Sequence, residues 1–391
     1  MLPLDGMRGI AVLAVMVFHF HMFSEIAGTG PAAAASEAVA RVGWVGVDLF
    51  FVLSGFLITG ILHDSKASIG YFRTFYVRRV LRILPLYYGV LAAFFLVLPA
   101  LFPTSAVVRN NTAGQLWFWT HLSNVQIALH GEWNAASTYV VHFWSLAVEE
   151  QFYLVWPIVV LRLTGRQLVR FCGGVMVFSL LLRVYLFATG AGIAAFVLTP
   201  ARMDTLAFGA VLAIVLRDPG LYAQVRRFAR PLAAVCAVLL SGIALWRGGL
   251  DKTDPITGTV GFTLLGALFG AAIFFSLTGV RGARYDRVLS SRSLRFFGKY
   301  SYALYVFHQP VALVLTSLGL PAALARIGAS GVAAQVAYAA VGTALSTVLA
   351  LSTWHLYEKQ FLKLKDRLAP QRFAAIAAPP PGYGAAVKVP C

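Results

Sequence analysis

Charged residues are scarce in this chain, and acidic residues are the scarcest of them. Only 12% of the 391 residues are charged and just 15 are Asp or Glu, whereas 59% are hydrophobic and the mean hydropathy is +0.76. A soluble domain of average composition has about 25% charged residues. This shortage excludes an ordinary water-soluble domain and indicates an integral membrane protein.

Cysteine is also rare. Cys172, Cys236 and Cys391 lie far apart in the sequence, and no CxxC motif occurs. An odd number of widely separated cysteines provides neither a disulfide framework nor a zinc site. The sequence therefore predicts no metal cofactor.

Basic residues, in contrast, outnumber acidic ones, and the net charge is +17. They lie in short loops between apolar runs, and no module that reads grooves or stacks on bases accompanies them. Lys and Arg in short loops mark the cytoplasmic side of a membrane protein. The excess therefore predicts topology, with a smaller part available for an anionic ligand, and excludes nucleic acid as the partner.

Apolar runs of about the length that crosses a bilayer as a helix recur along the chain. They lie near 7–23, 43–62, 83–101, 114–130, 143–161, 171–188, 202–216, 231–246, 257–279, 300–320 and 332–356. The basic loops fall on one side only if run 114–130 does not cross, and this run is short, aromatic and rich in polar residues. We therefore predict an all-α integral membrane bundle of about ten transmembrane helices, with 114–130 re-entrant or interfacial and both termini in the cytoplasm.

The two ends of the chain are expected to differ. The first run is predicted to be a retained helix and not a cleaved signal, because Asp5 lies where a signal would be basic and histidines interrupt the apolar stretch. Residues 1–363 are expected to form one transmembrane domain, and 364–391 a short cytoplasmic tail whose Pro- and Gly-rich end predicts disorder. Nothing in the sequence sets an oligomeric state.

The first run holds two ionisable residues on one helical face. Arg8 and His19 are eleven residues apart, which returns within about 20° of the starting direction and spans about 16 Å along the axis. With Arg8 at the cytoplasmic boundary, His19 is expected near the bilayer midplane. Ionisable groups at that depth usually mark a site or a pathway. The alternative is that Arg8 anchors the helix and His19 is a neutral hydrogen-bonding residue between helices.

These residues belong to a set of motifs spread over residues 4–365. The chain resembles the membrane acyltransferase-3 family, whose hallmark is Arg or Lys, ten residues, then His, as in LDGMRGIAVLAVMVFH. The resemblance continues through GVDLFFVLSGFLIT (46–59), FYVRRVLRILPLYY (75–88), HFWSLAVEEQFYLVWP (142–157), YSYALYVFHQPV (300–311) and YEKQFLKLK (357–365). Six motifs in the family's order make the resemblance specific.

The resemblance implies O-acyl transfer across a membrane. An acyl group, most often acetyl, would pass from cytoplasmic acyl-coenzyme A (acyl-CoA) to a hydroxyl of a glycan or other acceptor on the outer side. The expected location is a bacterial inner membrane, with membrane lipid around the helices. Many members carry an added hydrolase-like domain, and this chain is expected to be a member without one. The identities of the acyl group and the acceptor stay open.

Within that resemblance, the chemistry of the residues suggests roles. His19 is expected to be the base, because imidazole titrates near neutral pH. Arg8, Arg79 and Arg82 are expected to hold the phosphates of acyl-CoA, since Arg binds phosphate through a fork of donors. Glu149 is expected to orient His19 or to recognise the acceptor. The alternatives are topology signalling for the arginines, Arg78 included, and a structural ion pair for Glu149.

Further polar residues stand in apolar surroundings and are expected to contact the substrate. For Ser54 helix packing is an alternative, for Asp48 pairing with a cation, and for His308 hydrogen bonding to the backbone near Pro310. The full set is Asp48, Ser54, His142, Trp144, Ser145, Arg202, Asp204 and His308.

A secondary transporter or flippase is the alternative from another functional class. Ten spans, charged residues near the midplane and a basic cytoplasmic face would suit one. Transporters often show internal repeats with paired broken helices, and no such symmetry is apparent in the sequence. Acyl transfer is therefore the preferred prediction.

Overall fold

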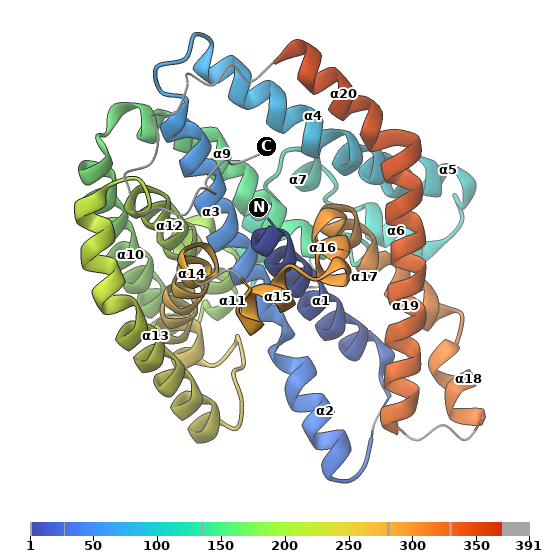
Figure 1. Cartoon of the computed structure of the whole chain (residues 1–391). Helices are drawn as coiled ribbons and strands as arrows, with labels where there is room; N and C mark the ends of the chain where they lie inside the picture. Colours follow the sequence, from blue (N-terminus) through green and yellow to red (C-terminus); the bar gives the residue numbers. More distant parts are fainter. Residues whose placement is uncertain (1, 27, 134–135, 280–281, 328–330, 370–391) are drawn as a thin grey trace.

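The structure is a computed structural model that describes residues 2–26, 28–133, 136–279, 282–327 and 331–369 (Figure 1). Throughout these residues the chain is helical with short connections, and they contain no strand, which confirms the predicted all-α class. The longer helices are α1 (Leu2–Ser24), α2 (Pro31–Arg41), α3 (Gly46–Asp64), α4 (Tyr71–Ala92), α8 (Ser123–His130), α9 (Trp144–Arg162), α10 (Gly165–Ala188), α12 (Thr199–Val215), α13 (Pro219–Arg247), α14 (Phe262–Thr278), α16 (Arg292–Lys299), α17 (Ser301–Ser317), α19 (Gly331–Thr353) and α20 (Lys359–Leu368).

Short elements extend or connect these helices. The α-helical ones are α5 (Leu98–Leu101), α6 (Ala106–Thr112), α7 (Leu116–Trp119), α11 (Gly192–Val197), α15 (Arg284–Leu289) and α18 (Leu320–Arg326). Two 3-10 turns, η1 (Val42–Val45) and η4 (Val141–Phe143), lead into α3 and α9, and three π-helical turns, η2 (Ala93–Val97), η5 (Thr257–Gly261) and η6 (Trp354–Glu358), continue neighbouring helices.

The membrane-spanning character of the bundle is confirmed. Within the described ranges, eight helical stretches are long and apolar enough to cross a bilayer, and α17 with α18, bent by 55°, makes a ninth. Helix α9 is 19 residues long and occupies the expected fifth run, but Glu149 and Glu150 interrupt its apolar character. The predicted ten spans correspond to these nine and α9, and the sides on which the termini lie stay a prediction.

Run 114–130 does not form a crossing helix. It consists of α7 and α8, four and eight residues long, separated by a turn in which His121 has a φ of 55°. The turn packs on the bundle, because Gln151 donates to the His121 carbonyl at 2.8 Å and Tyr87 donates to the Phe118 carbonyl at 2.8 Å. A re-entrant or interfacial segment was predicted here, and the short helices agree with it.

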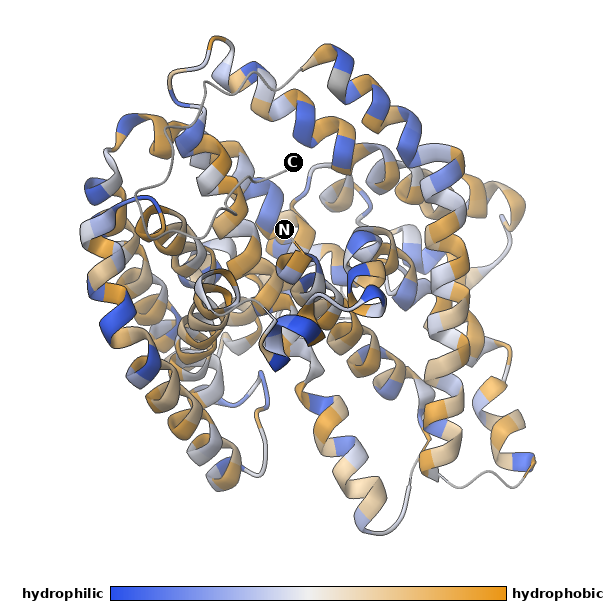
Figure 2. Cartoon of the chain, in the orientation of Figure 1, coloured by the Kyte–Doolittle hydropathy of each residue, from blue (hydrophilic) through white to orange (hydrophobic). Residues whose placement is uncertain are grey.

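The basic loops gather at one end of the bundle. Lys66 donates to the Leu163 carbonyl at 2.5 Å, and Arg217 forms a two-point ion pair with Asp64, so three of the loops meet. Helix α16 packs against the start of α1, and α4 and α20 lie together at one edge of Figure 1, with α2 and α18 at the opposite edge. In Figure 2, α4 and α20 alternate hydrophilic and hydrophobic residues, whereas most other helices are mainly hydrophobic.

Glycine allows two of the helices to cross at close range. A Cβ atom at Gly55 of α3 would lie 1.9 Å from the Leu206 carbonyl oxygen of α12, and one at Gly209 would lie 2.0 Å from the Val52 oxygen. Such approach is typical of small residues at membrane helix interfaces. The α3–α12 contact places the second motif at the centre of the molecule.

The predicted domain boundary at 363 falls inside a helix. Helix α20 continues to Leu368, because an amphipathic pattern persists through KQFLKLKDRL. The end predicted to be disordered, 370–391, lies outside the described residues.

Candidate functional site

A cavity of about 960 Å³ enters the bundle from the end where the basic loops gather. It extends from exposed Arg73 to buried Ser145. Its lining has a large excess of positive charge, which suits a ligand with several negative charges. The charged lining residues comprise eight cations, Arg8, Arg73, Arg78, Arg79, Arg82, Arg295, Lys299 and Lys365, and three acids, Asp5, Glu149 and Glu358.

The three arginines expected to bind phosphate all line this cavity. Arg8 contacts Asp5 at 3.3 Å, an ion pair between half-buried side chains that lie one helical turn apart. The Arg79 guanidinium lies 5.6 Å from the ring centroid of Tyr153, and Glu358 interacts electrostatically with Arg82. Helix α4 begins at Tyr71, so Arg78, Arg79 and Arg82 all lie within one regular helix, and that helix forms part of the cavity wall.

Ser54 and Glu149 belong to the inner part of the same cavity. The Ser54 and Tyr153 hydroxyls are hydrogen-bonded to each other, and the Glu149 carboxylate lies beside both. Ser54 therefore lines the cavity, and its expected contact with the substrate stays a prediction. Glu149 is thus placed among the cavity groups, and no described contact joins it to His19.

His19 is instead held by backbone and by another histidine. Its Nδ1 atom lies 2.9 Å from the Val15 carbonyl oxygen and 3.1 Å from Nε2 of His308. His308 Nδ1 lies 2.6 Å from the Tyr305 carbonyl oxygen. A carbonyl only accepts, so neutral His308 carries its proton on Nδ1 and presents Nε2 as an acceptor to His19. His19 then has its proton on Nδ1, and its Nε2 atom is left as the basic nitrogen.

In the described contacts the side chain hydrogen-bonded to His19 is His308 and not a carboxylate, and acceptor recognition by Glu149 stays a prediction. Hydrogen bonding to the backbone, the alternative for His308, also occurs, and the same tautomer serves both contacts. Sequence spacing does not reveal this pairing, because the two histidines are 289 residues apart.

His142 and Ser145 connect the histidines to the cavity. The His142 ring centroid lies 4.9 Å from that of His308, and the side chain is 2% exposed, with neither ring nitrogen hydrogen-bonded. Tyr305, which lines the cavity, donates to the His142 carbonyl at 2.8 Å and is hydrogen-bonded to Ser145 at 2.6 Å. His19 itself is absent from the described cavity lining, so Tyr305 and the other histidines lie between it and the cavity.

Trp144 is not part of the cavity lining. Its ring packs 4.8 Å from Phe196 and 6.3 Å from Trp133, within a buried group of aromatic side chains. Its ring also lies 6.4 Å from that of Phe51, which does line the cavity, so Trp144 stands behind the cavity wall.

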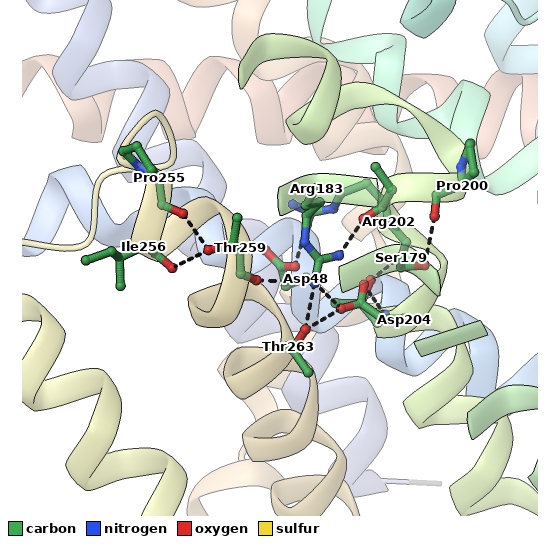
Figure 3. A network of polar contacts seen from close by, with 12 residues as sticks. Asp48, Ser179, Arg183, Pro200, Arg202, Asp204, Pro255, Ile256, Thr259 and Thr263 are labelled. Carbon is green, nitrogen blue, oxygen red and sulfur yellow. Dashed lines mark hydrogen bonds and ion pairs between the residues drawn. The ribbon is translucent and has the colours of Figure 1, made fainter. Parts of the chain in front are cut away.

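Asp48, Arg202 and Asp204 form a sealed polar network between α3, α10, α12 and α14 (Figure 3). Arg202 pairs with Asp48, and Arg183 pairs with Asp204 at 2.7 Å; all four side chains are 0% exposed. The Arg202 guanidinium also lies 4.0 Å from the ring centroid of Phe262.

This network does not reach the cavity in the described lining. Its burial favours a structural role over the expected substrate contact, because charges removed from water need partners and here find them in one another. Pairing with a cation was the alternative for Asp48, and the structure shows it.

The sequence patterns predict no functional role for several residues that line the cavity. Arg295 and Lys299 are on the amphipathic helix α16 and read there as topology signals, while Glu358 and Trp354 are on the π-helical turn η6. Arg183, which belongs to the buried network and not to the cavity, is an isolated charge within an apolar run, and that isolation is a sequence signal for a buried ion pair.

Known proteins resemble this chain over most of its length. It is 25% identical to the peptidoglycan O-acetyltransferase OatA of Listeria monocytogenes over 87% of this chain and 55% of that protein. It is 25% identical to the O-acetyltransferase OatA of Staphylococcus aureus (80% and 51% covered) and 28% identical to the putative peptidoglycan O-acetyltransferase YrhL of Bacillus subtilis (80% and 49% covered).

The chain thus spans about half the length of the curated relatives it matches, and no solved structure matches it. The family model covers the helix that holds Arg8 and His19 and extends to the turn that carries Trp354. The family described as "Acyltransferase domain" matches residues 2–354, and the chain belongs to this acyltransferase-3 family.

Proposed function

We propose that the protein is a membrane O-acyltransferase that moves an acyl group, acetyl above all, from acyl-CoA to a hydroxyl of a glycan. The observation that carries this proposal is the cavity with eight cations and three acids in its described lining. CoA carries several phosphate charges, which Arg and Lys bind through charge-assisted hydrogen bonds. The relatives named as peptidoglycan O-acetyltransferases support a glycan acceptor.

The geometry of His19 fits the role of general base. As the acceptor oxygen attacks the thioester carbonyl, His19 Nε2 takes the hydroxyl proton. The new C–O bond forms and the C–S bond breaks, and the imidazolium returns its proton to the CoA thiolate. The products are the O-acyl ester and free CoA thiol, with His19 neutral again. His308 Nε2, 3.1 Å from His19 Nδ1, stabilises the imidazolium by accepting a hydrogen bond from its Nδ1–H group.

Family membership favours this reading over a transporter or flippase. The two also differ in a measurable product, because only acyl transfer releases free thiol from acyl-CoA. A transporter would move its substrate with no change in the thioester.

The test uses purified protein in lipid nanodiscs. CoA binding is measured by calorimetry, and thiol release from acetyl-, propionyl- and succinyl-CoA is measured with a glycan acceptor present. The double variant Arg79→Gln/Arg82→Gln is expected to weaken CoA binding by at least about 100-fold, since each of the two lost charge-assisted hydrogen bonds contributes about 1.5–3 kcal/mol. Arg226→Gln/Arg227→Gln, which also removes two positive charges but from exposed positions of α13, is the matched control and is expected to bind normally.

His19→Ala separates binding from chemistry. It is expected to bind CoA like the wild type and to lose about 100-fold or more of thiol release, the usual contribution of a positioned base. Unchanged turnover in this variant would contradict the mechanism. Folded wild type that neither binds nor consumes any acyl-CoA would contradict the proposed donor.

A further inference from the structure

The end of the bundle opposite the cavity carries a rigid loop, 248–256, between α13 and η5. It turns at Gly248 and Gly249, with φ of 73° and 146°, a region that favours glycine. Trp44 Nε1 donates to the Leu250 carbonyl at 3.0 Å and fixes the loop to η1. The Asp254 carboxylate accepts from the backbone of Ile256 and Thr257 and so begins the next helix.

At the apex of this loop, Lys252 points into a group of aromatic rings. Its Nζ atom lies 4.7 Å from the ring centroid of Trp133, 5.0 Å from that of Phe18 and 5.0 Å from that of Phe196. These rings come from the segment after α8, from α1 and from α11. Four segments distant in sequence therefore converge on one ammonium group.

The described contacts give this ammonium no carboxylate partner. Asp251 is turned to the Thr253 backbone and hydroxyl, and Asp254 pairs with Arg247 at 2.5 Å. Burial lowers the pKa of Lys252 to about 8, with the Asp251 charge opposing that shift. Aromatic faces attract a cation but replace only part of its hydration. The site holds a positive charge that an anionic ligand would stabilise.

This site adjoins His19. The edge of the Phe18 ring meets the His19 ring with 5.0 Å between centroids, so one side chain separates the imidazole from Lys252. Four side chains of this region are partly exposed: Lys252, Phe18, Trp133 and His19. None of the four belongs to the described lining of the basic cavity. His19 thus keeps partial exposure next to the Lys252 group and outside the described cavity lining, so an acceptor bound at Lys252 would not have to share the basic cavity with the donor.

We propose that Lys252, with Phe18, Trp133 and Phe196, forms the acceptor subsite and selects a glycan that carries an anionic group. The rings would pack on the C–H faces of a sugar while the ammonium binds a carboxylate or phosphate oxygen of the same acceptor. This inference rests on the proposed acyl transfer, and it names the acceptor class as an acidic saccharide.

The test follows the Lys252 amine directly and so does not depend on the donor. Protein in nanodiscs is treated with sulfo-N-hydroxysuccinimide acetate, and acetylation of each lysine is followed by mass spectrometry, with exposed Lys363 at the other end as internal reference. Glucuronate, glucose 6-phosphate and glucose are the probes. An acidic sugar at about ten times its Kd is expected to slow Lys252 labelling by about tenfold and to leave Lys363 unchanged.

Each outcome has a meaning. Protection by glucuronate alone assigns the anion as a carboxylate, protection by glucose 6-phosphate alone assigns it as a phosphate, and protection by both supports the general class. Protection by neither, or equal protection by glucose, would overturn the proposal.

Two variants guard against a purely structural explanation. Lys252→Met keeps an unbranched side chain among the rings, and Lys252→Arg keeps the charge. Saturation-transfer NMR is expected to detect binding of the protecting acidic sugar to the wild type and Lys252→Arg but not to Lys252→Met, and retained binding in Lys252→Met would refute the subsite. CoA binding is expected to be equal in the wild type, Lys252→Arg and Lys252→Met. If none of the three proteins binds CoA, the proposed donor is refuted, while the result for the acceptor still stands.

Discussion

Removing one partner of the Asp48–Arg202 pair tests whether the sealed network is structural or touches substrate. Arg202→Met leaves the Asp48 charge 0% exposed with no counter-ion and removes the guanidinium from the Phe262 face. Breaking a buried pair in this way costs about 3–5 kcal/mol of folding free energy, because the remaining charge is uncompensated. The double variant Asp48→Leu/Arg202→Met removes both charges and is expected to recover most of that loss.

The first assay is thermal unfolding of the detergent-solubilised protein. The second is the acceptor KM, measured on the folded fraction of each variant. Arg247→Met breaks a pair whose arginine side chain is 42% exposed and is the matched control, expected to cost less than about 1 kcal/mol. If Arg202→Met unfolds at the wild-type temperature and only raises the acceptor KM, the network binds substrate and the structural reading is wrong. If the double variant is no more stable than the single ones, the pairing argument fails.

Three shorter predictions concern packing, positioning and pH. Gly55→Ala is expected to lower the unfolding temperature markedly, since its Cβ would lie 1.9 Å from the Leu206 oxygen, and normal stability would contradict the close crossing. His308→Ala is expected to lower kcat by roughly 10- to 100-fold with donor KM unchanged and a shifted pH profile, while His308→Gln, whose amide oxygen can accept from His19, recovers part of the rate. Binding of an acidic sugar is expected to weaken as pH rises through about 8, because Lys252 then loses its charge; a flat titration by NMR would exclude the ammonium as the contact.

Local periodicity predicts much of the fold. It identifies the apolar helices and the face shared by Arg79 and Arg82, because each depends on residues a few positions apart, while the non-crossing segment near 114–130 follows from the basic loops on either side of it. Charge along the chain also predicts that the basic loops meet, as the contact between Arg217 and Asp64 shows. These features arise from interactions of each segment with its own neighbours or with the bilayer.

Contacts between distant helices are what the sequence leaves open. Arg202 is 154 residues from Asp48, and no spacing rule distinguishes this pair from two separate substrate contacts. Glu149 similarly could face His19 or the arginines, and only the rotation of α9 relative to α1 decides that it lies beside Ser54 and Tyr153. Such choices depend on helix packing.

Acidic residues are scarce in this chain, so a region where cations lack acidic partners is a candidate site for an anionic ligand. Asp48, Asp204 and Asp64, within the bundle, are each matched by an arginine. Away from the exposed basic loops, the described residues depart from this balance in the cavity, with eight cations for three acids, and in the aromatic group around Lys252, with a single charge.

The difference in scale fits the two ligands of the proposed reaction. A donor with several phosphates would be bound by the many cations of the cavity, whereas an acceptor with one acidic group would be bound by the single ammonium of Lys252. Helix α1 joins the regions, since Arg8 lines the cavity and Phe18 contacts Lys252. His19 follows Phe18 directly, about 16 Å along the helix from Arg8, so the proposed base lies where a donor from one end and an acceptor from the other would meet.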